Sequence, residues 1–167
     1  MTPRLLTRFG DVFYAYDKPP GMAVHQNSED IPDLVSWLKR QRSLPRDLRP
    51  GHRLDRPTSG VVLCGAGREA RAQIAQWLEA ADKVYLALVA GAPEEDSGVF
   101  DAPLADARRK RPLDATTQYQ VRERMGGFTL LELRLITGRK HQLRRHLADA
   151  GLPVVGDTRY GPKRPTR

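Results

Sequence analysis

Hydrophobic positions recur along the chain with two different spacings, and these spacings predict both strands and helices. Alternating or short continuous apolar runs predict strands over residues 12–16, 61–64, 84–89, 116–122 and 128–136. Apolar residues three or four positions apart predict helices over residues 31–42, 69–81 and 138–150. Because the two kinds of element follow one another without a regular βαβ order, the pattern predicts an α+β fold with a mixed, largely antiparallel sheet and flanking helices.

The length and composition of the chain fit a soluble protein. Its 167 residues predict a single domain over residues 1–167, and its one cysteine, Cys64, excludes an internal disulfide. No apolar run is long enough to span a bilayer, and the first ten residues lack the hydrophobic core of a signal peptide. We therefore expect a cytoplasmic protein, and a monomer.

The charge of the chain indicates a polyanionic partner. The net charge is +8 and the sequence pI is about 10.1, and a positive field of this kind attracts nucleic-acid phosphates. A soluble protein can also be basic without binding a polyanion. The clustering of the cations, within residues 108–111 and again within 139–145, favours RNA.

The most polar segment of the chain is residues 51–60, where Asp55 follows Arg53 and precedes Arg56 in a loop that has a glycine at each end. Nearby cations keep a carboxylate ionised, and an ionised carboxylate is able to attack an electrophilic carbon. The alternative is that Asp55 only pairs with one of these arginines or caps a turn. Asp55 is therefore a candidate catalytic residue.

Two further segments carry candidate functional side chains. At the start of the last predicted helix, Gly138 is expected to leave backbone N–H groups for an anion, and Arg144 to project toward the end of the sheet. The alternative is a solvated basic face. On the strand predicted over residues 84–89, Tyr85 lies on the face opposite Val84, Leu86 and Leu88, either as a packing residue or as a surface on which a base stacks.

These segments, in this order, resemble the RluA family of RNA pseudouridine synthases, and most of all its tRNA pseudouridine synthase C branch. His-Arg-Leu-Asp-Arg-Pro-Thr-Ser-Gly at 52–60 is similar to the catalytic loop of the family, Lys-Val-Tyr at 83–85 to its tyrosine strand, and 137–145 to its arginine motif. Residues 17–21 and 156–161 are similar to weaker signatures. The resemblance covers residues 5 to 161, without an N-terminal S4-like module.

The resemblance implies the pseudouridine synthase fold with a central RNA-binding cleft. Family members usually continue beyond the last of these motifs, so it implies either a C-terminally shortened form or a sequence that omits a tail. The implied partner is RNA, tRNA first and ribosomal RNA second. The implied reaction, conversion of a uridine to pseudouridine, needs no cofactor and no metal.

The resemblance also implies roles for individual residues. Asp55 would attack either C1′ of the ribose or C6 of the uracil, Tyr85 would stack on the uracil and serve as a late general base, and Arg144 would pair with Asp55. Arg53 would fill the space that the flipped base leaves. The other residues expected to contact RNA are His52, Arg56, Thr58, Arg108, Arg109, Lys110, Arg111, Arg139, Lys140, His141 and Gln142.

Two other functions fit parts of this pattern. An inactive RNA-binding protein of the same fold would keep the basic clusters, but it has no need of Asp55, Tyr85 and Arg144 together. A metal-dependent nuclease or phosphotransferase needs clustered carboxylates or a glycine-rich phosphate loop, and the sequence shows neither. His141 and His146 also lack a carboxylate at metal-ligand spacing, so no metal site is expected.

Overall fold

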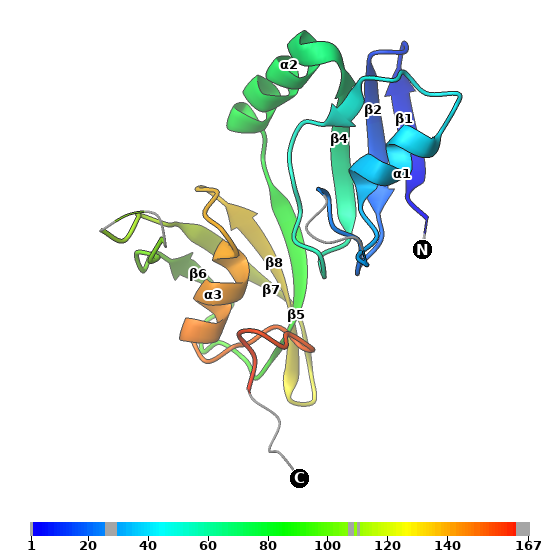
Figure 1. The fold of residues 1–167 in the computed structure, drawn as a ribbon. Helices are drawn as coiled ribbons and strands as arrows, with labels where there is room; N and C mark the ends of the chain where they lie inside the picture. The colour runs from blue at the N-terminus through cyan, green and yellow to red at the C-terminus, as the bar shows by residue number, and fades with distance from the viewer. Residues whose placement is uncertain (1, 26–29, 107–108, 110, 163–167) are drawn as a thin grey trace. The chain divides into compact units, whose positions relative to one another are not determined.

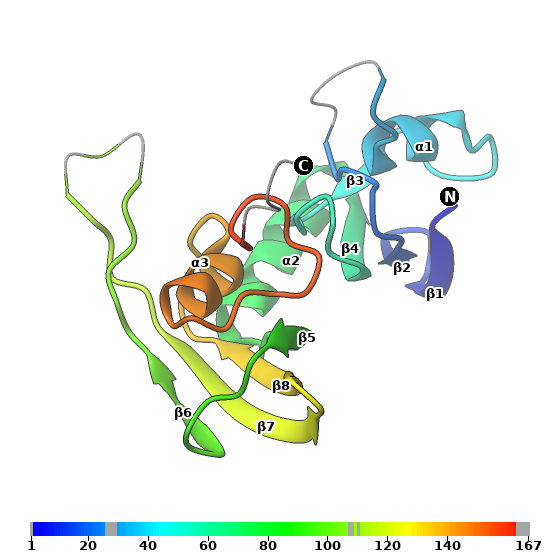
Figure 2. The same ribbon diagram turned by 90° about the horizontal axis from the view of Figure 1, so that it is seen from below.

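The computed structural model describes residues 2–25, 30–106, 109 and 111–162. The chain divides into two compact units, Met1–Ala81 and Asp82–Arg167, each with its own four-stranded sheet and hydrophobic core (Figures 1 and 2). Every ladder between the named strands of the described residues is antiparallel. The predicted α+β class is confirmed, with the strands distributed over two sheets.

The first unit is a sheet in the order β1-β2-β4-β3 with two helices. Its elements are β1 (Arg4–Phe9), β2 (Phe13–Lys18), α1 (Leu34–Arg40), β3 (Leu48–Pro50), β4 (Gly60–Ala66) and α2 (Gly67–Ala80). The core contains Tyr14 and Tyr16 of β2, Leu34 and Leu38 of α1, and Val62 of β4. Apolar residues four apart on α1 therefore bury one helical face against the sheet, as the spacing predicts.

The first unit begins its helix later than the sequence predicts. The side chain of Asp33 accepts a hydrogen bond from the backbone N–H of Ser36 at 2.8 Å, so Asp33 caps α1 and the helix starts at Leu34 rather than at residue 31. Sequence analysis also missed β1 and β3. All six residues of β1 are exposed, so it shows no alternation, and the alternation of β3 covers only three residues, which is too short to be recognised.

The second unit is a sheet in the order β5-β8-β7-β6 with one helix packed on it. Its elements are β5 (Val84–Ala90), β6 (Ser97–Phe100), β7 (Thr117–Met125), β8 (Phe128–Leu135) and α3 (Gln142–Asp149). Val89 of β5, Leu131 and Leu133 of β8, and Leu147 of α3 form the core. Sequence analysis missed β6, whose residues alternate only between exposed and half-buried.

The start of α3 corrects the prediction at Gly138. The helix begins at Gln142, because His141 adopts a left-handed backbone conformation with φ of 55°. The N–H of Arg139, which lies inside the predicted helix but three residues before the observed one, donates to the Gln142 side-chain oxygen at 2.9 Å. Gly138 therefore does not open the helix, and the backbone N–H of Arg139 is used within the protein rather than left for an anion.

Candidate active site

The loop that carries Asp55 is fixed at its first residues to β4. The backbone N–H of Gly51 donates to the carbonyl of Leu63 at 2.8 Å, and the N–H of Leu63 donates to Nε2 of His52 at 2.9 Å. Gly51 also lies directly against α2: a Cβ at this position would be 2.5 Å from Cγ2 of Ile74. Only glycine allows this close approach, so the loop leaves the sheet in one defined direction.

His52 therefore has a structural role in the first unit. Because its Nε2 accepts a hydrogen bond from Leu63, that nitrogen carries no proton. Burial lowers the pKa of His52 below its usual value, which agrees with a neutral ring. The expected RNA contact from His52 stays a prediction, and Nε2 is already used by the protein.

Lys18 fixes the middle of the loop, and sequence analysis did not assign it a role. Its side chain is fully buried at the end of β2, opposite Gly60 of β4. Nζ donates to the carbonyls of Met22 at 2.8 Å, Pro19 at 3.0 Å and Arg56 at 3.5 Å. Burial lowers the pKa of Lys18, and the negative charge of Asp55 opposes that shift.

The carbonyl of Arg56 also accepts the N–H of Gly21 at 2.8 Å, so it joins the turn after β2 to the Asp55 loop. The position of Lys18 in the sequence could have revealed its role. Lys18 follows Tyr14 and Tyr16 on the inward face of an alternating strand, where a lysine needs a specific partner.

Asp55 is half-buried, and its carbonyl accepts the N–H of Thr58 at 3.0 Å, which closes a turn. Arg53 and Arg56 are exposed on either side of it. The first unit therefore presents a carboxylate in a tethered turn, with exposed guanidinium groups beside it and the Lys18 charge nearby. This is an arrangement that holds a carboxylate in a defined orientation.

In the second unit Tyr85 is half-buried on β5, opposite Leu133 of β8, and it packs against the core. The apolar residues on the opposite face of β5 are Val84, Leu86 and Leu88, and they are exposed to 45%, 67% and 38%. Of the two alternatives for Tyr85, half-buried packing is therefore observed. Stacking on a uracil stays a prediction.

Arg144 of α3 is held by a buried carboxylate. Its Nε and Nη2 donate to Oδ2 and Oδ1 of Asp157 at 2.7 and 2.9 Å, and the Asp157 side chain is only 4% exposed. Hydrogen bonds from Arg144 hold the pKa of Asp157 at about 2, against the opposing effect of burial. The guanidinium carbon of Arg144 also lies 5.1 Å from the ring centre of Tyr160.

Tyr160 completes this group, which we call the Arg144 clamp (Arg144, Asp157 and Tyr160). Its hydroxyl lies 2.9 Å from Nδ1 of His141, the residue with the left-handed backbone. Sequence analysis placed Asp157 and Tyr160 in a weak signature without roles. The expected pair between Arg144 and Asp55 joins residues of different units and stays a prediction.

Gln142 is buried, and its side-chain amide is fully used within the second unit. Nε2 donates to the carbonyl of Thr116 and to Oγ1 of Thr117, at 2.9 and 3.0 Å. Oε1 accepts from Thr137 Oγ1 at 2.8 Å and from the N–H of Arg139. The side chain of Gln142 thus orders the segment before α3, and we leave it out of the proposed RNA contacts.

The remaining expected RNA contacts lie on exposed segments. Arg109, Arg111, Arg139 and Lys140 are exposed, and Arg108 and Lys110 lie outside the described residues. Leu104 and Leu113 exchange backbone hydrogen bonds of 2.9 Å at the base of the excursion over 101–114. His146 of α3 supports this base, with Nε2 lying 3.0 Å from the carbonyl of Ala102.

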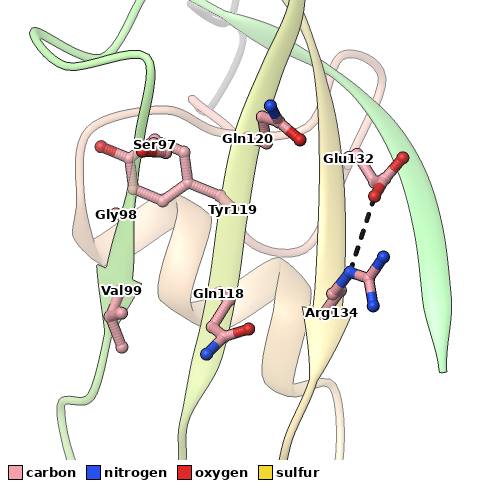
Figure 3. Close-up of a pocket in the computed structure, with 8 residues that line it drawn as sticks. All are labelled: Ser97, Gly98, Val99, Gln118, Tyr119, Gln120, Glu132 and Arg134. Carbon is pink, nitrogen blue, oxygen red and sulfur yellow. Dashed lines mark ion pairs between the residues drawn. The ribbon is translucent and has the colours of Figure 1, made fainter. Parts of the chain in front are cut away.

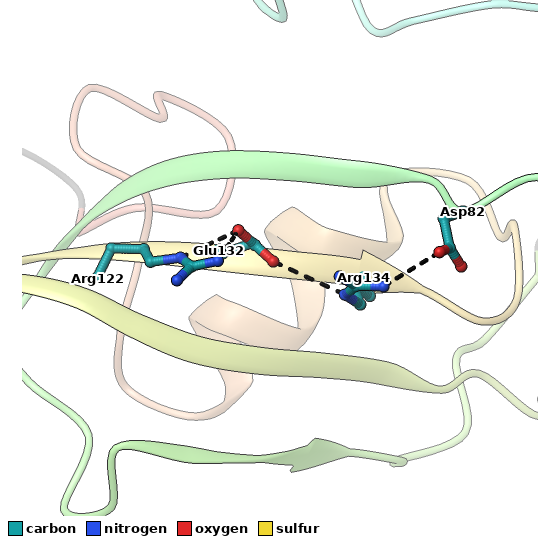
Figure 4. Close-up of polar contacts among 4 residues, drawn as sticks. All are labelled: Asp82, Arg122, Glu132 and Arg134. Atoms are coloured by element: carbon teal, nitrogen blue, oxygen red, sulfur yellow. Dashed lines mark hydrogen bonds and ion pairs between the residues drawn. The ribbon is translucent and has the colours of Figure 1, made fainter.

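A shallow hollow of about 330 Å³ lies over β6, β7 and β8, and none of the expected site residues line it (Figure 3). Two of its lining residues are charged: Glu132 pairs with both Arg122 and Arg134, and Nη1 of Arg134 lies 3.2 Å from Oδ2 of Asp82 (Figure 4). These charges are mutually paired, which is the arrangement of a solvated sheet face.

Comparison with known proteins decides the family. The sequence profile of the RNA pseudouridylate synthase family matches residues 12–149, which include Asp55, Tyr85 and Arg144. The chain belongs to this family. The expected resemblance to RluA-type RNA pseudouridine synthases is thereby confirmed, and both units of this family member contribute residues to the match.

Relatives of this family member act on different RNAs according to their names. It is 39% identical to a ribosomal large subunit pseudouridine synthase D of Xanthomonas campestris, over 87% of this chain and 48% of that protein. It is 37% identical to a tRNA pseudouridine synthase C of Salmonella typhimurium, over 92% and 68%. A relative from Chloroflexus aurantiacus, named an uncharacterized RNA pseudouridine synthase, is 38% identical over 89% and 52%. The chain thus spans about half the length of two of these relatives.

A solved structure also matches. The human RNA pseudouridylate synthase domain containing 4 superposes with a TM-score of 0.79 at 28% identity, over 96% of this chain and 70% of that one. Within the described residues, no group of three or more histidine, cysteine or acidic side chains is placed to hold a metal ion. In the same part of the chain, no helix is long and apolar enough to cross a membrane.

Proposed function

We propose that this chain converts a uridine of RNA to pseudouridine, with Asp55 as the catalytic carboxylate. One observation carries the proposal. The fully buried Lys18 donates a hydrogen bond to the carbonyl of Arg56, the residue that follows Asp55, and so holds the Asp55 turn in place. A protein that only bound RNA would need exposed cations, but it would not need a carboxylate oriented by a buried charge. The family match covers this segment.

In the proposed reaction the Asp55 carboxylate forms a transient covalent bond to C1′ of the ribose or to C6 of the uracil, and this bond breaks again before the product leaves, which regenerates the carboxylate. The N1–C1′ glycosidic bond breaks, the base turns, and a C5–C1′ bond forms in its place. C5 loses its proton and N1 gains one, so the product is an isomer of the substrate. Electrons and atoms balance without an external oxidant or reductant. Tyr85 stacks on the flipped uracil and accepts the C5 proton, and Arg144 pairs with the Asp55 carboxylate.

The target uridine is flipped out of the RNA helix, because stacking and pairing inside the helix keep side chains from C1′ and from the face of its uracil. Arg53 occupies the vacated stack, and exposed Arg109, Arg111, Arg139 and Lys140 contact phosphates. The substrate is a tRNA, with ribosomal RNA as the second candidate. We further propose that both units act together as one catalytic domain with a central RNA-binding cleft, in a cytoplasmic monomer.

The test is pseudouridine mapping on unmodified tRNA and ribosomal RNA transcripts, incubated with the chain without added metal or nucleotide. The variant Asp55→Asn keeps the size of the side chain but removes the nucleophile. Asp11→Asn is a matched control, because Asp11 is an exposed acid in a turn of the same unit. We expect product at one defined uridine with the wild type and Asp11→Asn, and none with Asp55→Asn, which still binds RNA.

Substantial activity of Asp55→Asn would contradict the role of Asp55. Tight RNA binding by the wild type without product on either RNA would contradict the proposed activity, and it would favour an inactive RNA-binding protein.

A further inference from the structure

A second cationic surface lies in the first unit and extends from the end of α1 into β3. Residues 39–49 contain Lys39, Arg40, Arg42, Arg46 and Arg49 and a single acid, Asp47. The first four of these cations are exposed. We call this segment the 39–49 surface.

The cations of the 39–49 surface lack the counterions that other arginines of this unit have. Arg4 pairs with Asp17 and Arg8 pairs with Asp11, each at 3.4 Å. Within the described part of the chain, no carboxylate pairs with Lys39, Arg40, Arg42 or Arg46. Repulsion between neighbouring cations costs stability unless an anion neutralises them. Their positive charge is therefore available to a ligand.

The 39–49 surface is hollowed and its backbone is fixed. Lys39, Arg42 and Arg46 line a hollow of about 490 Å³ together with Leu38, Gln41, Leu44 and Pro45. Nη1 of Arg49 donates to the carbonyls of Arg46 and Leu48, at 3.0 and 2.7 Å, and Nη1 of Arg71 from α2 donates to that of Asp47 at 3.3 Å. The guanidinium groups of Arg49 and Arg71 hold the turn through neutral backbone carbonyls. No carboxylate charge is used in these bonds, so both positive charges add to that of the surface.

The 39–49 surface lies at the other end of the first sheet from the part of the Asp55 loop that Lys18 holds. The loop enters β4 at Gly60, whereas Leu48, at the end of the surface, is opposite Ala66. Six residues of strand separate these positions, which corresponds to roughly 20 Å. Figure 1 shows the segment between α1 and β3 at the end of the sheet where α2 starts.

We propose that the 39–49 surface binds phosphates of the substrate RNA away from the target uridine. The proposal rests on the proposed function, because it takes RNA as the substrate. Arginine guanidinium groups bind phosphate oxygens in pairs, and a surface with several unpaired arginines around a hollow fits a phosphodiester backbone better than a single anion. A site roughly 20 Å from the loop end would favour substrates that extend beyond one short stem-loop.

The experiment compares two double variants of the full chain. Arg42→Gln with Arg46→Gln removes two charges from the 39–49 surface. Arg4→Gln with Arg8→Gln is the matched control, because it removes two exposed arginines of the same unit that already have carboxylate partners. RNA binding is measured by fluorescence anisotropy at several salt concentrations, using the RNA that the wild type modifies, or a full-length tRNA if it modifies none.

For Arg42→Gln with Arg46→Gln we expect the slope of log K against log salt to become less steep by about 1.5, since each phosphate contact contributes roughly 0.7 to 0.9. With a modified substrate, KM should rise while kcat stays the same. A stem-loop too short to extend roughly 20 Å from the target should show neither change. The control variant should match the wild type throughout.

Equal slopes for the wild type and Arg42→Gln with Arg46→Gln would overturn the proposal, and so would a wild type that binds no RNA. A wild type that binds RNA without forming pseudouridine would contradict the proposed activity alone, because the comparison of binding slopes would still decide the role of the 39–49 surface.

Discussion

The geometry of the Arg144 clamp predicts how much stability the second unit loses when Asp157 is replaced by asparagine. Asp157 accepts hydrogen bonds from Nε and Nη2 of Arg144, and from the backbone N–H groups of Arg159 and Tyr160 at 2.9 and 3.1 Å. In Asp157→Asn, one oxygen remains for the backbone donors, but an NH₂ group replaces the other oxygen. The variant therefore turns a donor toward the guanidinium and removes its counterion.

The pKa of Asp157 gives the magnitude. Hydrogen bonds from Arg144 lower it from 3.8 to about 2, which corresponds to roughly 2 kcal/mol of stability. Because the folded-state pKa lies below the unfolded one, this stability is fully present above pH 3.8 and is lost as the pH falls toward 2. We expect Asp157→Asn to lower the free energy of unfolding by about 2 kcal/mol at pH 7, and by about half of that at pH 3.

The assay must report on the second unit. Both tryptophans, Trp37 and Trp77, belong to the first unit, so tryptophan emission does not monitor the clamp. Amide hydrogen exchange in β8 and α3 measures the opening free energy where the substitution acts. Asp96→Asn is the matched control, because Asp96 also pairs with an arginine, Arg124, at 2.9 Å but is 85% exposed. It should change stability by only a few tenths of a kcal/mol.

Activity provides a second measurement, since the clamp is expected to position Arg144 rather than to contact RNA. In Asp157→Asn, kcat should fall at least tenfold while KM changes little, and Asp157→Glu should recover part of kcat. If Asp157→Asn behaved like Asp96→Asn in hydrogen exchange, or if its effect did not shrink between pH 6 and pH 3, the account of the clamp would be refuted.

Three further predictions concern the Asp55 loop. Gly51→Ala should destabilise the first unit by roughly 1–3 kcal/mol in urea unfolding followed by tryptophan emission, because the new Cβ would lie 2.5 Å from Ile74. In the wild type, the free energy of unfolding should fall as the pH drops below 6.5, since the pKa of His52 is lowered in the folded state; in His52→Gln this fall should be smaller. Lys18→Met should lower kcat and cost about 2 kcal/mol in the same unfolding assay, because it leaves the carbonyl of Met22 without its donor.

A specific result would contradict each of these three predictions. Unchanged stability of Gly51→Ala would mean that the loop shifts away from α2 freely. Equal pH dependence of wild type and His52→Gln would mean that His52 is not the titrating group. Full activity of Lys18→Met would separate the buried lysine from the orientation of Asp55, and it would remove the main support for the proposed function.

Much of the fold was predictable because burial alternates along the inner strands and helices. On β2 the inward side chains Tyr14 and Tyr16 belong to the core, and the spacing of Leu34 and Leu38 locates α1. The edge strands were not predictable in the same way. β1 buries none of its six residues, so its pairing with β2 depends on backbone hydrogen bonds that carry no side-chain signature.

In the candidate site, too, residues of one local segment were predictable from the sequence, whereas contacts between distant segments were not. Asp55 is recognisable within ten residues of sequence, because its flanking arginines and glycines all lie in one loop. The group that tethers that loop is not local: Lys18 donates to the carbonyl of Arg56, 38 positions away. Arg144 and Asp157 are 13 positions apart, separated by the end of α3.

A buried charge is nevertheless recognisable in the sequence, because it is a charged residue at a position where the hydrophobic pattern of the strand predicts an apolar one. Lys18 occupies an inward position of an alternating strand, where an apolar residue would follow from Tyr14 and Tyr16. Burying a lysine is costly unless its ammonium group finds acceptors, so such a position requires backbone carbonyls from a loop nearby. The turn after β2 and the Asp55 loop supply them. The residue that departs from the hydrophobic pattern is therefore the one that connects the fold to the candidate catalytic loop.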